Sequence, residues 1–226
     1  MAKALLIPAA GSATRLRGLP KFLLPTTEQN VSLLERHLDI LSGYFDEVLI
    51  GINPDFEHLI RSVVNETDKI QIHPMSTKTM METVINLAAL TSCENFVVVM
   101  PDTYFSYYPE IIEFLVRENP DSIPTLMCWE MSDFQRGKLG QVLINTNGSI
   151  ADIRDKDLDC EYQYFWGVAQ FSELELDTAN VSDSHIGFMF EKLVASGCQV
   201  NALKISGQYF DCGTQNEYIS MLKSNS

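Results

Sequence analysis

The residues with the most evident chemical potential lie in the loop after the first apolar run, residues 9–17 (AAGSATRLR). Small residues let backbone N–H groups come close to an anion, and consecutive N–H groups can surround phosphate oxygens. Arg15 adds a planar fork of donors, and Lys21 adds a mobile positive charge. We therefore predict that this segment binds a phosphate-containing ligand. The alternative is a flexible turn with solvated cations, because turns of small residues are common.

A second candidate is Asp102, which follows the most β-rich run of the chain, residues 96–100 (FVVVM). In open α/β sheets, ligands bind in the crevice outside the carboxyl ends of the strands. A carboxylate placed there suits Mg²⁺, which in phosphate sites takes one or two carboxylates together with substrate oxygens. We predict this role for Asp102. The alternative is that Asp102 only begins the loop to the next helix.

A third candidate is Asp211, which lies within the short sequence YFDCGT at residues 209–214. Phe210 and Cys212 flank it, so its carboxylate is expected to be partly desolvated and to need a partner. A metal ion shared with Asp102 would be such a partner. A helix cap or a hydrogen-bonded core residue is the alternative interpretation of Asp211.

These candidates need elements that bring them together, and the hydrophobic pattern of the first 120 residues predicts such elements. Apolar runs typical of buried strands alternate with amphipathic helices. Strands are expected at residues 4–8, 47–53, 69–72 and 96–100, and helices at 31–44, 56–64, 79–90 and 109–116. Strands that are apolar on both faces and separated by helices indicate a parallel sheet covered on each side.

After residue 120 the pattern changes to strands with little helix between them. Strands are expected at residues 123–131, 140–145, 149–155, 162–171, 199–205 and 209–212, and helices at 186–196 and from 215. Asn147-Gly148 predicts a type I′ hairpin turn, because that turn requires positive φ. No internal repeat or linker is evident. We predict one α/β domain over residues 1–226, with a mostly parallel central sheet flanked by helices and a more antiparallel C-terminal half.

The composition favours a globular protein and argues against several other classes. The 226 residues are 46% hydrophobic and 20% charged, which is typical of a folded domain. The net charge of −14 argues against a nucleic-acid partner, which needs a basic face. No apolar run approaches the roughly 20 residues that span a bilayer. The first 27 residues nevertheless contain four cations and no acid, which supports an anion site in this segment.

The N-terminus and the cysteines bear on the cellular compartment. Residues 1–10 imitate a signal peptide, but their apolar stretch is short and Pro8 interrupts it, so a buried first strand is preferred. The five cysteines are odd in number and widely spaced, and none forms a Cys-x-x-Cys pair. This favours reduced thiols over disulfides or a zinc site, and a cytoplasmic location is predicted.

In their order along the chain, these segments resemble the signatures of the sugar-phosphate nucleotidyltransferases, typified by the glucose-1-phosphate thymidylyl- and uridylyltransferases. The family's Ala-Ala-Gly-x-Gly-Thr-Arg-Leu and Pro-Lys-x-Leu-x-Pro resemble residues 9–16 and 20–25. Its Gly-Asp resembles Pro101-Asp102, and its Asp-x-Gly-Thr is matched by residues 211–214. Weaker likenesses occur at residues 140–144, 147–150, 155–157 and 164–168. The resemblance extends from residue 4 to about residue 220.

The resemblance implies a Rossmann-like nucleotidyltransferase fold and an Mg²⁺-dependent reaction. A nucleotidyl group would pass from a nucleoside triphosphate (NTP) to a sugar 1-phosphate or similar phosphorylated acceptor, giving an NDP-sugar and pyrophosphate. Residues 1–120 would form the nucleotide-binding half, and residues 121–226 the acceptor-binding half. Relatives of this family often assemble, so a homo-oligomer is also an expectation.

The resemblance also implies roles for individual residues. The NTP would lie over Ala10, Gly11, Ser12, Ala13 and Thr14, with Thr79 also facing the nucleotide. Arg15 and Lys21 would hold the phosphates as catalytic residues, and Asp102 and Asp211 would hold the metal. Lys156 would bind the phosphate of the acceptor, and Trp166 would line its pocket. The alternatives are a solvated cation for Lys156 and core packing for Trp166.

Two departures from the family pattern leave the substrates open. Ala13 stands in place of the second glycine of the opening signature. The segment that reads the base in thymidylyltransferases is replaced by residues 73–80 (HPMSTKTM), which contain no glycine. Lys78 or Thr79 would then face the nucleotide. Neither the base nor the acceptor follows from the sequence.

Two alternative functions use a similar scaffold. A glycosyltransferase that consumes an activated sugar usually carries an Asp-x-Asp at the end of a central strand, whereas here Tyr104 stands two residues after Asp102. A non-catalytic nucleotide-sugar-binding protein has no evident need for two separated acids that converge on a metal. The residues therefore favour the nucleotidyltransferase.

Overall fold

The computed structural model describes residues 2–11, 19–27, 31–116 and 123–224. Ser12, Ala13, Thr14 and Arg15, four of the residues predicted to bind the nucleotide, lie outside these ranges. Within the described part, no helix has the length and apolar composition that would let it cross a membrane.

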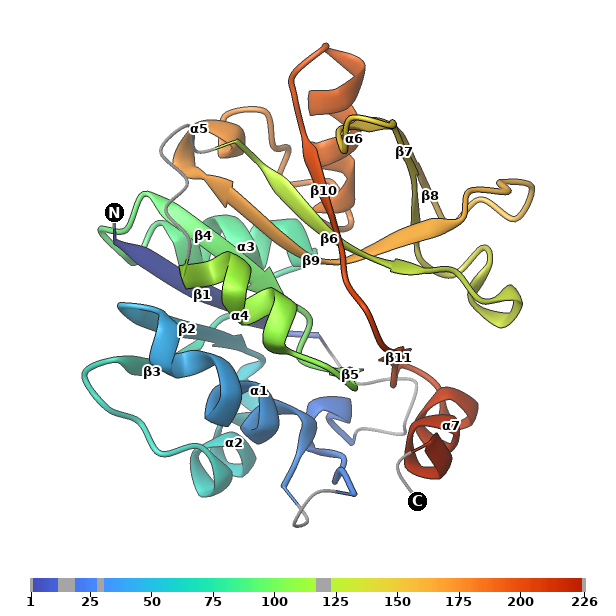
Figure 1. The fold of residues 1–226 in the computed structure, drawn as a ribbon. Coiled ribbons are helices and arrows are strands. Elements are labelled where there is room, and N and C mark those ends of the chain that lie inside the picture. Colours follow the sequence, from blue (N-terminus) through green and yellow to red (C-terminus); the bar gives the residue numbers. More distant parts are fainter. Residues whose placement is uncertain (1, 12–18, 28–30, 117–122, 225–226) are drawn as a thin grey trace.

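A mixed sheet forms the centre of the molecule (Figure 1). Within the described residues it has nine strands, and its main path runs in the order β10-β6-β9-β4-β1-β2-β3, with β7 and β8 attached through β9. The strands are β1 (Lys3–Ala9), β2 (Glu47–Ile52), β3 (Ile70–Pro74), β4 (Asn95–Val99), β6 (Thr125–Glu130), β7 (Gly140–Ile144), β8 (Ile150–Asp155), β9 (Tyr164–Ser172) and β10 (Asn201–Lys204).

The pairing of the strands divides the sheet as the sequence predicted. Strands β1 to β4 pair in parallel, with β1 between β2 and β4. Strand β9 then pairs antiparallel with β4, β6 and β7, and β7 pairs antiparallel with β8. The α/β class, the mostly parallel first half and the more antiparallel second half are therefore confirmed.

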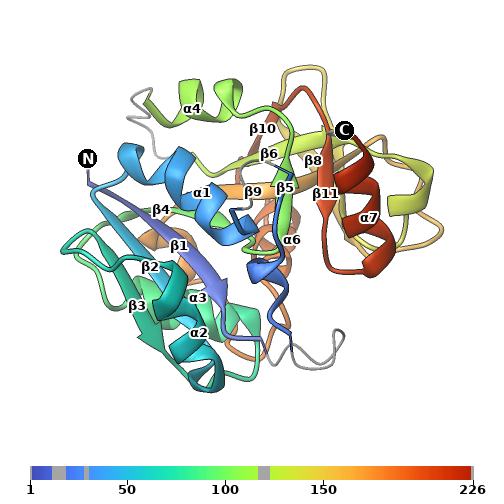
Figure 2. The same ribbon diagram turned by 90° about the horizontal axis from the view of Figure 1, so that it is seen from below.

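Helices cover both faces of the sheet, as Figures 1 and 2 show. The helices are α1 (Leu33–Leu41), α2 (Glu57–Val63), α3 (Met80–Ala88), α4 (Pro109–Val116), α5 (Glu173–Leu176), α6 (Gly187–Ala195) and α7 (Gln215–Ser224). Side chains of α1 and α4 pack with Leu5 and Ile7 in one core cluster, whereas α3 and α6 pack with Ala4 and Leu6 in another. This division follows from β1 alone, because successive side chains of a strand point to opposite faces.

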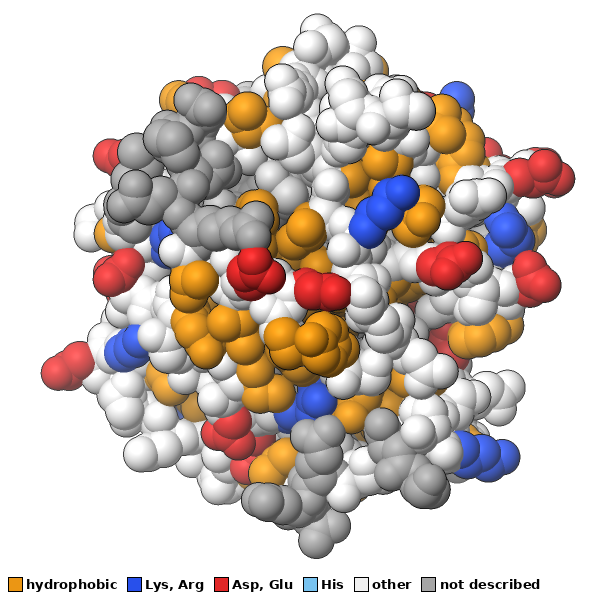
Figure 3. Space-filling model, in the orientation of Figure 1, with side chains coloured by type: hydrophobic (Ala, Val, Ile, Leu, Met, Phe, Trp, Pro, Cys, Tyr) orange, Lys and Arg blue, Asp and Glu red, His pale blue; other side chains and the backbone are white. Residues whose placement is uncertain are grey.

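The surface over α4 is partly apolar. Hydrophobic side chains gather there on the face drawn in Figure 3, and acidic and basic side chains are scattered around them. Tyr107, two residues before this helix, and Val116, its last residue, are 44% and 61% exposed.

A second, small sheet lies beside the central one and was not predicted. It consists of β5 (Thr103–Phe105) and β11 (Tyr209–Asp211), which pair antiparallel. The sequence predicted the strand at residues 209–212 but no strand after Asp102. A run of three residues is too short to show a period, so its partner can be identified only in the folded chain.

The hairpin between β7 and β8 is confirmed, but its turn type was predicted wrongly. Gly148 has φ +85°, whereas Asn147 does not have positive φ. The backbone N–H of Gly148 donates to the carbonyl of Asn145 over 3.0 Å, so the two central turn residues are Thr146 and Asn147. Glycine therefore follows a turn of the type I kind instead of forming its second central residue.

Helix α1 buries an unusual polar pair against the small sheet. Ser32 caps the helix in a capping box with Glu35, which fixes where the helix begins. Arg36 and His37, one turn later, are only 6% and 1% exposed. Because buried polar groups need hydrogen-bond partners, these two side chains require specific neighbours on β5 and after it.

Those neighbours are Tyr108 and Thr103. Arg36 Nη1 donates to the Tyr108 hydroxyl over 2.9 Å, and that hydroxyl lies 2.9 Å from His37 Nδ1. His37 Nε2 lies 2.9 Å from the carbonyl oxygen of Thr103. Burial, and then the nearby charge of Arg36, lower the pKa of His37 to about 3. His37 is therefore neutral in the folded protein at every physiological pH.

We predict that His37 makes stability fall as the pH is lowered. The unfolded chain binds a proton on His37 near pH 6.5 and the folded chain near pH 3, so the contribution of this residue is complete above pH 6.5 and is lost as the pH falls toward 3. Between pH 7.5 and 5 the loss amounts to about 2 kcal/mol. Denaturant titrations at the two pH values should show a smaller loss for His37→Gln than for wild type. Equal losses of the free energy of unfolding in the two proteins would contradict the prediction, since all other titrating groups are shared.

Candidate active site

A cavity of about 400 Å³ opens beyond the carboxyl ends of β1 and β4. Its lining comes from four segments of the chain: residues 8–11, 20–22, 77–80 with Thr83, and 100–102. Five residues that the sequence proposed for the site line it together: Ala10, Gly11, Lys21, Thr79 and Asp102. The loop after the first strand and the carboxylate after the fourth therefore meet in one place, as the parallel arrangement of β1 and β4 requires.

Lys21 and Asp102 form an ion pair at the edge of this cavity. Lys21 begins the short 3₁₀ helix η2 (Lys21–Leu23), and its Nζ atom lies 3.5 Å from Oδ2 of Asp102. The lysine side chain is 13% exposed and the aspartate side chain 28%, so both can still be reached by a ligand. An ammonium group in this position can interact with an anionic ligand and with the carboxylate at once.

The small sheet brings Asp211 next to Asp102. Asp211 lies opposite Thr103 in the β5–β11 ladder, and the N–H of Cys212 donates to the carbonyl of Asp102 over 2.9 Å. Two acids from distant parts of the chain are thus joined through neighbouring backbone positions.

Gly213 allows this close approach. Its N–H donates to Oδ1 of Asp211 over 2.9 Å. A Cβ atom at residue 213 would lie 2.7 Å from that oxygen and 3.3 Å from Nζ of Lys21. A side chain at this position would therefore push apart the aspartate and the lysine, which explains the glycine of the Asp-x-Gly-Thr sequence in physical terms.

The carboxylates of the site are crowded. Burial, followed by the negative charges of Asp102 and Glu217, raises the pKa of Asp211 to about 6. The hydrogen bond from Gly213 and the charge of Lys21 act in the opposite direction without cancelling the effect. Among the described residues, acidic groups therefore outweigh basic ones beside Asp211 at neutral pH.

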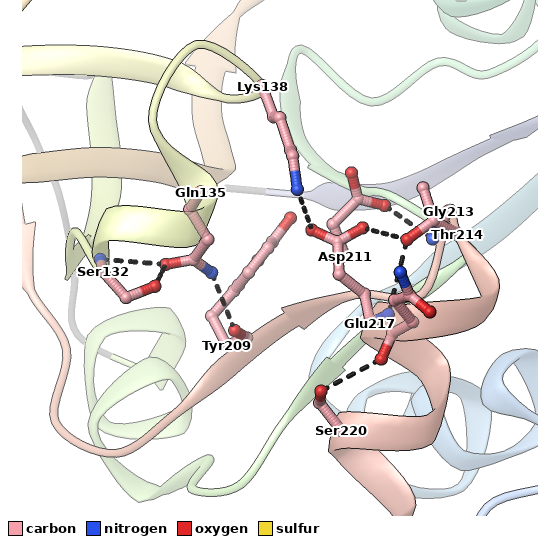
Figure 4. A network of polar contacts seen from close by, with 10 residues as sticks. Ser132, Gln135, Lys138, Tyr209, Asp211, Gly213, Thr214, Glu217 and Ser220 are labelled. Atoms are coloured by element: carbon pink, nitrogen blue, oxygen red, sulfur yellow. Dashed lines mark hydrogen bonds and ion pairs between the residues drawn. The ribbon is translucent and has the colours of Figure 1, made fainter.

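Two residues of the site were missed by the sequence analysis, Glu217 and Lys138 (Figure 4). Glu217 is 4% exposed, and its Oε2 atom accepts a hydrogen bond from the Thr214 hydroxyl over 2.8 Å. Lys138, which precedes β7, places Nζ 3.8 Å from the other oxygen, Oε1. The Thr-x-x-Glu spacing of a helix start could have indicated Glu217. Nothing local in the sequence indicates Lys138.

The side chains present would suit Mg²⁺. Asp102 and Asp211 offer the carboxylate oxygens that this ion prefers, and their crowding favours a nearby positive charge. In the described part of the chain, no group of three or more His, Cys, Asp or Glu side chains could hold a metal ion. Two carboxylates suffice for an ion that also binds substrate phosphates.

Thr79 lies at the edge of the cavity, where its hydroxyl is already engaged. It accepts a hydrogen bond from the N–H of Glu82 over 3.0 Å, and so caps α3. It also donates to the carbonyl of Val181 over 2.8 Å. Its proposed contact with the nucleotide would therefore use the remaining lone pair or the methyl group.

Lys156 and Trp166 lie outside the lining of this cavity. Lys156 is exposed after β8 and has φ +51°. Trp166 on β9 is 8% exposed and packs against Phe190, with 6.2 Å between the ring centroids. Its indole nitrogen is buried and has no hydrogen-bond partner among the residues that the structure describes. The roles of these two residues in binding an acceptor remain predictions.

We predict that replacing one acid of the crowded pair stabilises the metal-free protein and removes its response to metal. Asp211→Asn keeps the acceptor for the Gly213 N–H but removes the charge, so Tm in EDTA at pH 8 should rise by at least about 2 °C. Added Mn²⁺ or Mg²⁺ should raise Tm of the wild type but not of this variant. Asp159→Asn, an exposed acid, is the control and should behave as wild type. A metal response that survives in Asp211→Asn would show that the metal binds elsewhere.

Comparison with known proteins gives matches in structure but not in sequence. No protein-family model and no curated protein matches the chain. UDP-glucose pyrophosphorylase in complex with UDP-glucose has a TM-score of 0.81 and 17% identity, covering 100% of this chain and 98% of that one. The inositol-1-phosphate CTP transferase from T. maritima has a TM-score of 0.76 and 17% identity, covering 99% and 95%.

HddC from Yersinia pseudotuberculosis, complexed with GMP-PN, has a TM-score of 0.72 and 17% identity, covering 100% of both chains. Identities this low establish the fold alone. Each match extends over nearly the whole of both chains. The chain thus has the Rossmann-like fold of the sugar-phosphate nucleotidyltransferases, which the order of its sequence motifs predicted.

Proposed function

We propose that this protein is an enzyme that transfers a nucleotidyl group from an NTP to a sugar 1-phosphate or similar phosphorylated acceptor. The products would be an NDP-sugar and pyrophosphate. The observation that carries the proposal is the meeting of Lys21, Asp102 and Asp211 around Gly213, at the edge of a cavity at the carboxyl ends of the strands. Two paired acids and a lysine suit a polyphosphate with its metal ion.

The groups that line the cavity differ in chemistry, which would orient the NTP. Lys21 and Asp102 contribute an ion pair, whereas residues 77–80 with Thr83 contribute three hydroxyl groups, a methionine and the cation of Lys78. The triphosphate would lie beside Lys21 and Asp102, with the backbone of Ala10 and Gly11 next to it. Ser12, Ala13, Thr14 and Arg15 would complete its binding, and the base would lie toward Thr79.

The chain's own groups would act by position and charge. A phosphate oxygen of the acceptor would attack the α-phosphorus in line, and the bond from that phosphorus to the leaving pyrophosphate would break. No protein nucleophile is needed, because the acceptor phosphate is already anionic. Lys21 and Arg15 would stabilise the negative charge of the phosphates, and this electrostatic contribution is the main catalytic effect expected of the protein.

Mg²⁺ is the cofactor of the proposal, held by Asp102 and Asp211. When bound, it would neutralise charge on the reacting phosphates. The acceptor would be bound by residues 121–226, with Lys156 near its phosphate and Trp166 beside it. Lys138 is a further cation of this half and lies close to the acids of the site. A cytoplasmic location and a homo-oligomer are kept as predictions, and the substrates are the only partners proposed.

We predict that neutralising Lys21 or Arg15 lowers kcat/KM by about 10²-fold or more, as loss of a group that stabilises transition-state charge does. Pyrophosphate release should be measured with ATP, CTP, GTP, UTP and dTTP against a panel of sugar phosphates. Arg17→Ala is the matched control, because it removes a cation from the same segment, and its effect should be less than tenfold.

Two outcomes would contradict the proposed function. Equal losses of kcat/KM in Lys21→Ala and Arg17→Ala would indicate that the cations of this segment act as a diffuse positive charge and not as a defined triphosphate site. No pyrophosphate release with any pair, together with nucleotide binding that is independent of metal in calorimetry, would indicate a non-catalytic nucleotide-sugar-binding protein.

A further inference from the structure

We propose that His37 is a positioning residue for the metal site. Through its hydrogen bond to the backbone of Thr103, it holds β5 so that Asp102 and Asp211 can bind one divalent cation together. The inference rests on the metal site of the proposed function, but not on the identity of the NTP or the acceptor.

Strand β5 needs such support, because the sheet to which it belongs is very small. β5 and β11 comprise three residues each and form a two-stranded sheet apart from the central one. An isolated pair of strands is marginally stable at best in water. The position of Asp102, which directly precedes β5, therefore depends on contacts made by other elements.

The donors and acceptors around His37 follow from the groups that face its two ring nitrogens. The carbonyl of Thr103 can only accept, so Nε2 of the neutral ring carries the proton and donates to it. Nδ1 then accepts from the Tyr108 hydroxyl, whose oxygen accepts from Arg36. A neutral imidazole in one tautomer satisfies every member of this chain. The bond from Tyr108 thus fixes the orientation of the His37 ring, and with it the direction of the hydrogen bond to Thr103.

Thr103 is the point at which this support reaches both acids. It follows Asp102 in the chain and faces Asp211 across the ladder. Its hydroxyl donates to the carbonyl of Met100 over 2.8 Å, which closes the turn that contains Asp102. A shift of the Thr103 backbone would thus change the separation of the two acids.

The same helix also supports the lysine of the site. The N–H of Leu33, at the start of α1, donates to the carbonyl of Leu24, just after the 3₁₀ helix of Lys21. Phe22 in that segment packs in the same core cluster as Leu34 and Leu38 of α1. Helix α1 therefore carries both the segment of Lys21 and, through His37, the segment of Asp102.

The test compares two replacements of His37. His37→Gln keeps an N–H that can reach the Thr103 carbonyl, whereas His37→Leu removes it. The dissociation constant for Mn²⁺ alone is measured by electron paramagnetic resonance of the free ion. We expect it to rise at least fivefold in His37→Leu and to stay within twofold of wild type in His37→Gln.

Two controls separate positioning from simple destabilisation. Leu193→Ala truncates a core side chain of α6 on the opposite face of the sheet, and should lower Tm with less than a twofold change in Mn²⁺ affinity. Hydrogen exchange of peptides covering residues 103–105 should become faster in His37→Leu but not in Leu193→Ala. If His37→Leu does not fold, Tyr108→Phe removes the bond to Nδ1 while keeping the ring, and should weaken Mn²⁺ binding at least twofold.

Three results would overturn the inference. The first is an unchanged Mn²⁺ affinity in His37→Leu, or in Tyr108→Phe if that variant is used. The second is a loss of Mn²⁺ affinity in Leu193→Ala equal to that in His37→Leu. The third is wild-type Mn²⁺ binding that does not depend on Asp102 or is not measurable. Failure of the proposed function has a different signature. Mn²⁺ binding would then depend on Asp102 and His37 as expected, but no NTP and acceptor would release pyrophosphate.

Discussion

The structure depends on one electrostatic constraint: Asp102 and Asp211 must share a partly buried space in which their charges repel each other. Glu217 adds a third acid nearby, and the pKa of Asp211 rises to about 6 as a result of burial and these neighbours. Among the described residues, Lys21 at 3.5 Å from Asp102 and Lys138 at 3.8 Å from Glu217 supply two positive charges to these three acids. Such an arrangement favours the binding of a cation, because charge in low dielectric needs a partner.

Backbone geometry makes this arrangement possible. The β5–β11 ladder places Asp211 opposite the residue that follows Asp102, and Gly213 leaves room for both Asp211 and Lys21. Helix α1 supports the ladder from behind through the buried chain of Arg36, Tyr108 and His37. The acids are thus held by a small sheet, while the cavity beside them is built by the carboxyl ends of the large parallel strands. The candidate site lies where the small β5–β11 sheet meets the carboxyl ends of the parallel strands.

The fold leaves the choice of substrate to the residues of the cavity. The similar structures include proteins named for UDP-glucose and for CTP, and one complexed with GMP-PN, all at the same 17% identity. Chains with one architecture are therefore found with different bases. In this chain residues 77–80 and Thr83 line the cavity away from the proposed triphosphate position, so under the proposed function discrimination among bases is expected from that segment.

Much of the fold and part of the site could be predicted from the sequence by itself. Apolar runs with helices between them predicted the parallel strands, because strand and helix periods act over a few residues. Local patterns also singled out Ala10, Gly11 and Asp102, which line one cavity, and Asp211, which lies beside Asp102. The partner of β11, the salt bridge of Lys138 and the network of His37 were not predictable in this way. Each depends on which distant segments pack together, and only the tertiary structure decides that, because long-range register leaves no period in the sequence.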